Sequence, residues 1–245
     1  LALCVCVQHM VRADRAAAGV MFTTDTESGF PGLVRIEGAW GLGEGVVKGE
    51  VTPDSFALFK PLLGRAELAP IIGRERGEKA TRVVYRAGSG VKHSAVPAAM
   101  RRRFVLSDAE LLQLGAWAVA IEKLYGVPMD IEWAKDGPKG GLYIVQARPE
   151  TVHSRRRADA LTTYRLSRKG RRVLTGTAVG DAAATGRVFH AKSPADARHF
   201  PDGAILVARE TDPDWVPLMR RAAAVVTERG GRTSHAAIVS REFGI

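Results

Sequence analysis

The chain has 245 residues, of which 46% are hydrophobic and 25% charged. This balance excludes a disordered chain and a membrane protein, and the length fits one large domain or two ordinary ones. The formal charge of +10 raises nucleic acid as a partner. However, the basic clusters lie in loop-like stretches without an aromatic-rich binding motif, so we expect no nucleic-acid binding.

The first seven residues, "LALCVCV", are apolar. They are too short to cross a bilayer and have neither a charged leader nor a cleavage site, so we expect a buried strand. Cys4 and Cys6 form neither a CxxC motif nor a zinc site, which indicates core thiols and a cytoplasmic location. Because the chain lacks an initial Met and ends inside a helical pattern, we expect a piece of a longer protein.

Residues 1–150 alternate strand-like runs with turn formers. Strands are predicted at "LALCVCVQHMV", "AGVMFTTD", "GLVRIEGAW", "SFALFK" and "ATRVVYRA". A helix should begin after the N-cap Ser107, where Glu110 completes a capping box, and should end at Gly126 and Pro128. The runs "MDIEWAK" and "GLYIVQARP" flank "DGPKGG" and therefore predict a hairpin.

A second domain is predicted after a polar, arginine-rich stretch. We place the first domain at 1–152, a linker at 153–172 and the second domain at 173–245. Short strands at "GRVFHA", "AILVAR" and "AAVVTE" alternate there with helical patterns around 194–199 and 213–222, and "RGGRTSH" leads into a final helix. The expected fold class is a mixture of α+β and α/β.

The predicted hairpin carries polar residues at alternate positions. Side chains alternate along a strand, so Asp130 and Glu132 share a face, as do Ile144, Gln146 and Arg148. A carboxylate and an amide oxygen suit Mg²⁺, and an arginine beside them suits phosphate oxygens. These side chains would equally fit an exposed, solvated sheet face, and spacing alone does not decide between the two interpretations.

The stretch "RGGRTSH" places His235 at the start of a helix. A neutral imidazole can attack phosphorus, and a glycine-rich turn with a helix N-terminus stabilises the anionic product. Arg232, Thr233 and Ser234 add donors. A lone histidine at such a position is otherwise a helix cap or a surface residue.

Several blocks together resemble the ATP-grasp domain of the phosphoenolpyruvate synthase family, which is related to pyruvate phosphate dikinase and rifampin phosphotransferases. They are "VQHMVRADRAAAGVMFTTDTESGF", "WGLGEGVVKGEVTPDSFALFKP", "YGVPMDIEWAKDG" and "LYIVQARPETV", and they follow the family's order. The resemblance implies a partial ATP-grasp domain followed by a swivelling β/β/α phosphohistidine domain. It implies these roles: Glu132 and Gln146 as Mg²⁺ ligands, Arg148 as the phosphate-binding arginine, Gly19 and Thr23 in a nucleotide-contacting turn, and Gln8 in a hinge strand beside the adenine.

The segment "GGRTSHAAIVSREFGI" resembles the family's phosphohistidine signature, which implies that His235 is the phosphocarrier. Thr233 then matches a threonine that a regulatory kinase and phosphorylase modifies in such synthases. Ser234 departs from the cysteine found in many of them. "TDPDWVPLM", from Thr211 to Met219, also matches the family, and we interpret it as a structural helix start.

The resemblance implies a homodimeric enzyme that converts ATP, pyruvate and water to AMP, phosphoenolpyruvate and phosphate. The pyruvate site would lie in a barrel domain beyond Ile245, and cationic groups of the ATP-grasp fold would lie before Leu1. One alternative is a rifampin phosphotransferase with a different acceptor. Another is a non-catalytic ATP-binding or phosphocarrier relic.

Overall fold

The computed structural model describes residues 7–26, 28–65, 67–138, 140–150, 170–180, 182–232 and 234–245. Residues 1–6 of the predicted first strand, with Cys4 and Cys6, lie outside these ranges, as does most of the predicted linker.

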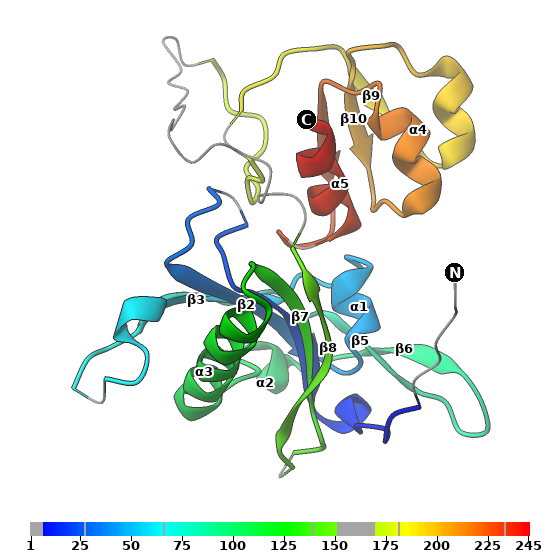
Figure 1. The fold of residues 1–245 in the computed structure, drawn as a ribbon. Coiled ribbons are helices and arrows are strands. Elements are labelled where there is room, and N and C mark those ends of the chain that lie inside the picture. Colours follow the sequence, from blue (N-terminus) through cyan, green and yellow to red (C-terminus); the bar gives the residue numbers. More distant parts are fainter. Residues whose placement is uncertain are drawn as a thin grey trace, which may run out of the picture.

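A six-stranded antiparallel sheet forms the centre of residues 17–149, with strand order β4-β3-β2-β1-β7-β8 (Figure 1). Most of these strands match the predicted runs, whereas β4 was not predicted because "IIGRE" is short and polar at its end. The strands are β1 (Ala17–Phe22), β2 (Leu33–Trp40), β3 (Asp54–Phe59), β4 (Ile71–Glu75), β7 (Met129–Lys135) and β8 (Leu142–Pro149).

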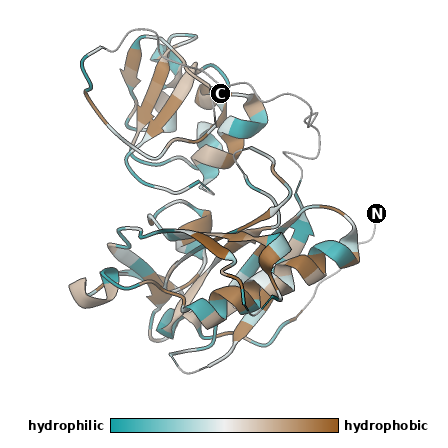
Figure 2. Ribbon diagram, turned by 90° about the vertical axis from the view of Figure 1, so that its left-hand side faces the viewer, coloured by the Kyte–Doolittle hydropathy of each residue, from teal (hydrophilic) through white to brown (hydrophobic). Residues whose placement is uncertain are grey.

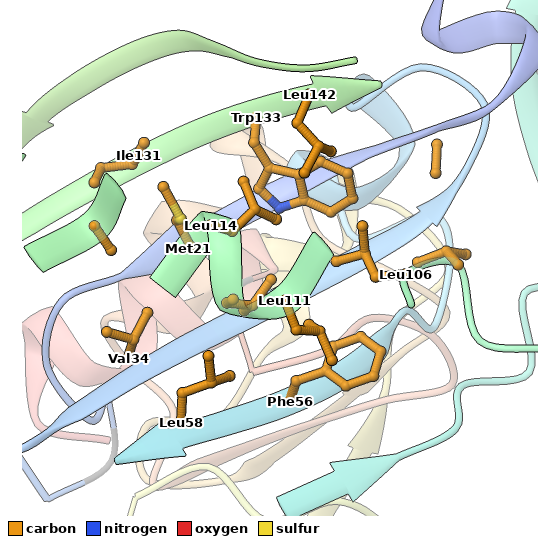
Figure 3. Packing of buried hydrophobic residues seen from close by; sticks show 14 of the residues in the cluster. Met21, Val34, Phe56, Leu58, Leu106, Leu111, Leu114, Ile131, Trp133 and Leu142 are labelled. Carbon is orange, nitrogen blue, oxygen red and sulfur yellow. The ribbon is translucent and has the colours of Figure 1, made fainter. Parts of the chain in front are cut away.

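Helix α3 (Asp108–Tyr125) covers one face of this sheet (Figure 1). The predicted capping box is confirmed: Ser107 and Glu110 bond each other's backbone amides, and Gly126 ends the helix in a left-handed conformation. Leu111 and Leu114 of α3 point into the cluster formed with Phe56, Ile131 and Trp133 of the strands (Figure 3). Burying such side chains stabilises the fold by about 1.5–3 kcal/mol each.

Short elements surround the sheet. A hairpin of β5 (Thr81–Tyr85) and β6 (Val91–Ala95) forms a separate two-stranded sheet, of which only β5 was predicted. The remaining elements are η1 (Ala13–Arg15), α1 (Glu44–Val47), η2 (Lys60–Leu62) and α2 (Ala98–Arg101). Val46 of α1 packs with Val20 and Phe22 on the sheet face opposite α3, so α1 lies above the middle of that face.

The predicted hairpin of β7 and β8 is confirmed, but its alternation is interrupted. Its register shifts beside Trp133, because Glu132 pairs with Gln146 whereas Trp133 pairs with Ile144. Val145 is therefore an extra residue of the kind found in a β-bulge. Ile144 packs against the α3 cluster, so the expectation that it shares a face with Gln146 and Arg148 is wrong.

A smaller parallel sheet, ordered β11-β10-β9, forms the second unit (Figure 1). Its strands are coloured mainly as hydrophobic in Figure 2, and Leu206, Trp215 and Leu218 belong to a cluster of their own. The three predicted strands are confirmed. The elements are β9 (Val188–His190), η4 (Pro194–His199), β10 (Ile205–Ala208), η5 (Pro213–Trp215), α4 (Val216–Met219), β11 (Ala224–Thr227) and α5 (His235–Phe243).

The segment before β1 differs from expectation. The described residues 7–12 form no strand, so the predicted hinge strand is instead an irregular segment. Gln8 connects this segment to β8 by donating from Nε2 to the Val145 carbonyl at 3.4 Å. Among the described helices, none is long and apolar enough to cross a membrane.

Candidate functional site

One row of polar side chains runs across the sheet on the face opposite α3. The buried partners Phe56, Ile36, Met21 and Ile131 form the neighbouring row and face the α3 cluster. Because successive side chains alternate between faces, the next row points the other way. In register, that row consists of Glu75, Ser55, Glu37, Val20, Glu132 and Gln146.

Glu132 and Gln146 stand opposite each other in this row. Burial raises the pKa of the Glu132 carboxyl, the charge of Asp130 raises it further, and Arg148 lowers it. Within the described residues, no hydrogen bond or ion pair engages that carboxylate. A half-buried carboxylate beside another negative charge fits a site that a cation completes, with the Gln146 amide oxygen as a neighbouring ligand.

The described residues contain no cluster of three or more His, Cys, Asp or Glu side chains able to hold a metal. Mg²⁺ does not need one, because it takes one or two protein ligands and fills its shell with water and phosphate oxygens. Arg148 lies beside Glu132 but donates from Nε and a terminal nitrogen to one oxygen of Asp130, at 2.8 and 2.7 Å. Its side chain is still 59% exposed, which leaves further donors for phosphate.

A pocket of about 320 Å³ adjoins Glu132. Its walls come from the segment before β1, the loop before α1 and the strands β1, β5, β7 and β8, and they include Gln8, Gly19, Leu42, Tyr85 and Val145. The pocket combines apolar walls with an acidic edge, which is typical of a small-molecule site.

Gly19 and Thr23, which the resemblance implies lie together in one nucleotide-contacting turn, lie at different ends of β1. Gly19 lies within β1 and lines the pocket, where an added Cβ would lie 1.9 Å from the Glu37 carbonyl oxygen. Thr23 is fully buried at the other end of β1, where its hydroxyl accepts a hydrogen bond from the Met129 amide at 2.8 Å. The "GVMFT" segment is therefore a strand rather than a turn, and Thr23 joins β1 to β7 instead of lining the pocket.

His235 is the first residue of α5, as predicted. The Ser234 hydroxyl caps the helix by accepting from the Ala237 amide. The Nδ1 atom of the imidazole lies 3.1 Å from the Thr211 hydroxyl, whereas no described residue bonds Nε2. Burial lowers the pKa of the imidazole, and the charges of Asp212 and Glu242 offset part of that shift.

The histidine loop, residues 228–235, contacts the polar row of the sheet. Arg232 forms an ion pair with Glu75 at 3.1 Å. Two glycines approach the opposite unit closely beside this pair. A Cβ added to Gly231 would lie 3.1 Å from Glu37 Oε2, and a Cβ added to Gly49 would lie 2.6 Å from Ser234 Cβ. Figure 1 shows α5 on the side of the second unit nearest the sheet.

Sequence reasoning missed some of these residues. The sequence pattern alone favours a structural role for Thr211. However, Thr211 follows β10 as the histidine loop follows β11, and parallel neighbours end at the same sheet edge. That topology was a usable signal. Glu75 and Gly49 gave no such signal, because they meet the histidine loop only in three dimensions. Thr233 lies outside the described residues.

Known protein families match parts of both units. A family model described as the AMP/ATP-binding domain of pyruvate phosphate dikinase matches residues 1–168. A second, described as the mobile domain of PEP-utilising enzymes, matches residues 200–245. Similar curated relatives are the phosphoenolpyruvate synthases of Pseudomonas aeruginosa, Aquifex aeolicus and Escherichia coli, at 51%, 49% and 48% identity over 99–100% of this chain. The chain spans about 30% of the length of these relatives.

Proposed function

The chain belongs to the family of the pyruvate phosphate dikinase AMP/ATP-binding domain, and on that premise we propose that it carries the ATP site and the phosphocarrier histidine of a phosphoenolpyruvate synthase. The observation that carries this proposal is the contact between the histidine loop and the sheet face that bears Glu132. A donor site and an acceptor imidazole on one face are what phosphoryl transfer between them requires.

The nucleotide would occupy the pocket beside β1 and β8, in an ATP-grasp fold. Gln8 and the walls around Gly19 would hold the base and sugar, while Glu132 and Gln146 at the pocket's acidic edge would bind Mg²⁺ on the phosphates. Bound Mg²⁺ would supply charge neutralisation of the phosphate oxygens. The exposed donors of Arg148 would add hydrogen bonds to the same oxygens.

His235 would receive the phosphoryl group on Nε2. In the transfer, the Nε2 lone pair bonds to the β-phosphorus of ATP, and the bond between that phosphorus and the oxygen it shares with the α-phosphate breaks. The electron pair leaves with AMP. Water then removes the terminal phosphate, and a monophosphoryl group remains on the histidine. The lowered imidazole pKa supports this role, because only the neutral ring has a lone pair to donate.

We propose pyruvate as the final acceptor, bound by a part of the whole protein outside this chain. The similarity to three phosphoenolpyruvate synthases supports this acceptor over an antibiotic. The second unit would then act as a carrier that moves between two sites, with a boundary near residues 153–172. A homodimer in the cytoplasm, with Thr233 as a regulatory phosphorylation site, completes the proposal.

Labelling of the whole protein with ATP carrying ³²P at the β-phosphorus tests the proposal. We expect acid-labile, base-stable label, with one AMP formed per label in a single turnover. His235→Ala should abolish the label, and His199→Ala, an exposed histidine in the same unit, should keep it. Label that persists in His235→Ala would refute the carrier role.

The acceptor is tested by a chase of the labelled protein. Pyruvate should remove the label and yield labelled phosphoenolpyruvate, whereas a rifamycin antibiotic should not. The opposite result would identify the antibiotic kinase. Absence of any label in the unmodified whole protein would instead favour a non-catalytic relic.

A further inference from the structure

Thr211 contacts the proposed phosphocarrier His235 but has no role in the phosphoryl transfer proposed for it. The residue is 4% exposed, and its hydroxyl lies 3.1 Å from His235 Nδ1. The two residues come from different loops, one after β10 and one after β11, which meet because the parallel strands end at the same edge. The contact therefore depends on the tertiary fold and not on a local turn, and it involves the proposed reactive imidazole.

The segment around Thr211 is held firmly. The Asp212 carboxylate accepts from the Asp214 amide at 2.9 Å and so caps the 3-10 helix that follows. Trp215 in that helix is buried in the cluster of the second unit. On the other side, the Arg229 amide donates to the Arg209 carbonyl and so continues the pairing of the two loops. The hydroxyl is therefore presented to the imidazole from a fixed backbone.

From this geometry we infer that Thr211 is a positioning residue that keeps the proton of the neutral His235 ring on Nδ1 and so leaves the Nε2 lone pair free for phosphorus. A hydroxyl can accept the Nδ1–H bond, and no other described residue engages either ring nitrogen. The opposite tautomer would carry its proton on Nε2 and would be unreactive there. This inference rests on the proposed role of His235.

The hydroxyl also suits the states that follow. When Nε2 bonds to phosphorus, the donor's P–O bond breaks, its electron pair leaves with the donor oxygen, and the Nδ1 proton stays on a ring that is now cationic. The Thr211 oxygen continues to accept that stronger, charge-assisted bond. The same acceptor oxygen thus serves the neutral ring before transfer and the cationic ring after it.

Two substitutions in the whole protein separate the hydroxyl from the side-chain volume. Thr211→Val keeps the shape but removes the acceptor, and Thr211→Ser keeps the acceptor but removes a methyl group. We expect Thr211→Val to slow labelling by ATP about tenfold, the size of one lost hydrogen bond to a group that becomes charged. Thr211→Ser should stay within a few fold of the unsubstituted protein.

A spectroscopic readout distinguishes a tautomer effect from a merely structural one. In protein labelled with ¹⁵N-histidine, the His235 resonances are those that vanish in His235→Ala. We expect the unsubstituted protein and Thr211→Ser to show Nδ1 protonated and Nε2 bare at neutral pH. Thr211→Val should show a mixture or the reverse. A proton on Nε2 in the unsubstituted protein would overturn the inference, and so would unchanged labelling and tautomer in Thr211→Val.

The site of phosphorylation gives an independent check. Alkaline hydrolysis of the labelled protein should release only the Nε2-phosphorylated isomer of histidine, and the Nδ1 isomer would overturn the role of Thr211 while leaving His235 as carrier. Label that survives His235→Ala would instead refute the proposed function. The tautomer measurement would still stand in that case, because it requires no phosphorylation.

Discussion

Gly49 offers the sharpest test of the contact between the histidine loop and the sheet face. Its φ is +73°, a backbone conformation that residues other than glycine rarely adopt, and a Cβ on this residue would lie 2.6 Å from Ser234 Cβ. Gly49→Ala therefore introduces two separate effects: backbone strain within the first unit and a steric clash with the loop that presents His235.

The sizes of the two effects differ. Placing alanine in the left-handed region costs roughly 1–2 kcal/mol of folding stability. The clash is relieved if the histidine loop withdraws by about 1 Å, because carbon atoms prefer separations of roughly 3.5–4.0 Å. A displacement of that size at a reacting group can lower a rate by about 100-fold. We therefore expect phosphorylation of His235 to fall between about 10-fold and 100-fold, with a modest loss of stability.

Gly90→Ala is the matched control. Gly90 has a φ of +75°, and an added Cβ would meet no atom within 4 Å. Both variants should lose similar free energy of unfolding in urea, while only Gly49→Ala should show slow label incorporation in a rapid-quench assay. Equal labelling rates in the two variants would refute the proposed docking of the loop beside Gly49.

Three further outcomes are expected. Asp54 and Lys79 form a fully buried ion pair, so Asp54→Ala should cost about 3–5 kcal/mol of unfolding free energy in denaturant titrations, and Lys79→Met in the same chain should recover part of that loss. Glu75→Arg should slow labelling a few fold through the exposed pair with Arg232, and exchanging the two charges should restore the rate; failure of this rescue would contradict the pairing. Because burial lowers the pKa of His235, the labelling rate should begin to fall at a lower pH than it would with an ordinary histidine, as a pH–rate profile would show.

Local signals in the sequence were sufficient for several elements. The capping box at Ser107 and Glu110 and the stop at Gly126 define α3 because they satisfy the helix ends with groups that are close along the chain. The hairpin of β7 and β8 was predictable for the same reason. Within the hairpin, the expectation that Glu132 and Gln146 converge followed from the two-residue alternation of side chains along a strand.

The failures have a common physical origin in contacts between distant segments. The bulge at Val145 places Ile144 on the α3 face of the sheet, opposite to the face of Gln146. No residue in "GLYIVQARP" indicates a bulge at this position. The strand predicted from the residue pattern of "AGVMFTTD" is present, whereas the turn implied by the resemblance is not, and Gly19 is there because the Glu37 backbone passes too close for a side chain. The hydroxyl of Thr23 accepts a hydrogen bond from the Met129 amide, more than 100 residues away along the chain, and no local pattern marks that contact.

The composition of the contact between the two units bears on how the carrier would work. Among the described residues it includes close backbone approaches at Gly49 and Gly231 and the Arg232–Glu75 pair, in which the glutamate is 64% exposed. The hydrophobic clusters of the described residues each stay within one unit. An exposed ion pair contributes at most about 1 kcal/mol, and glycines contribute shape rather than buried apolar area. These described contacts position His235 with little buried apolar area, which suits the proposed carrier, because the carrier would have to leave for a second site.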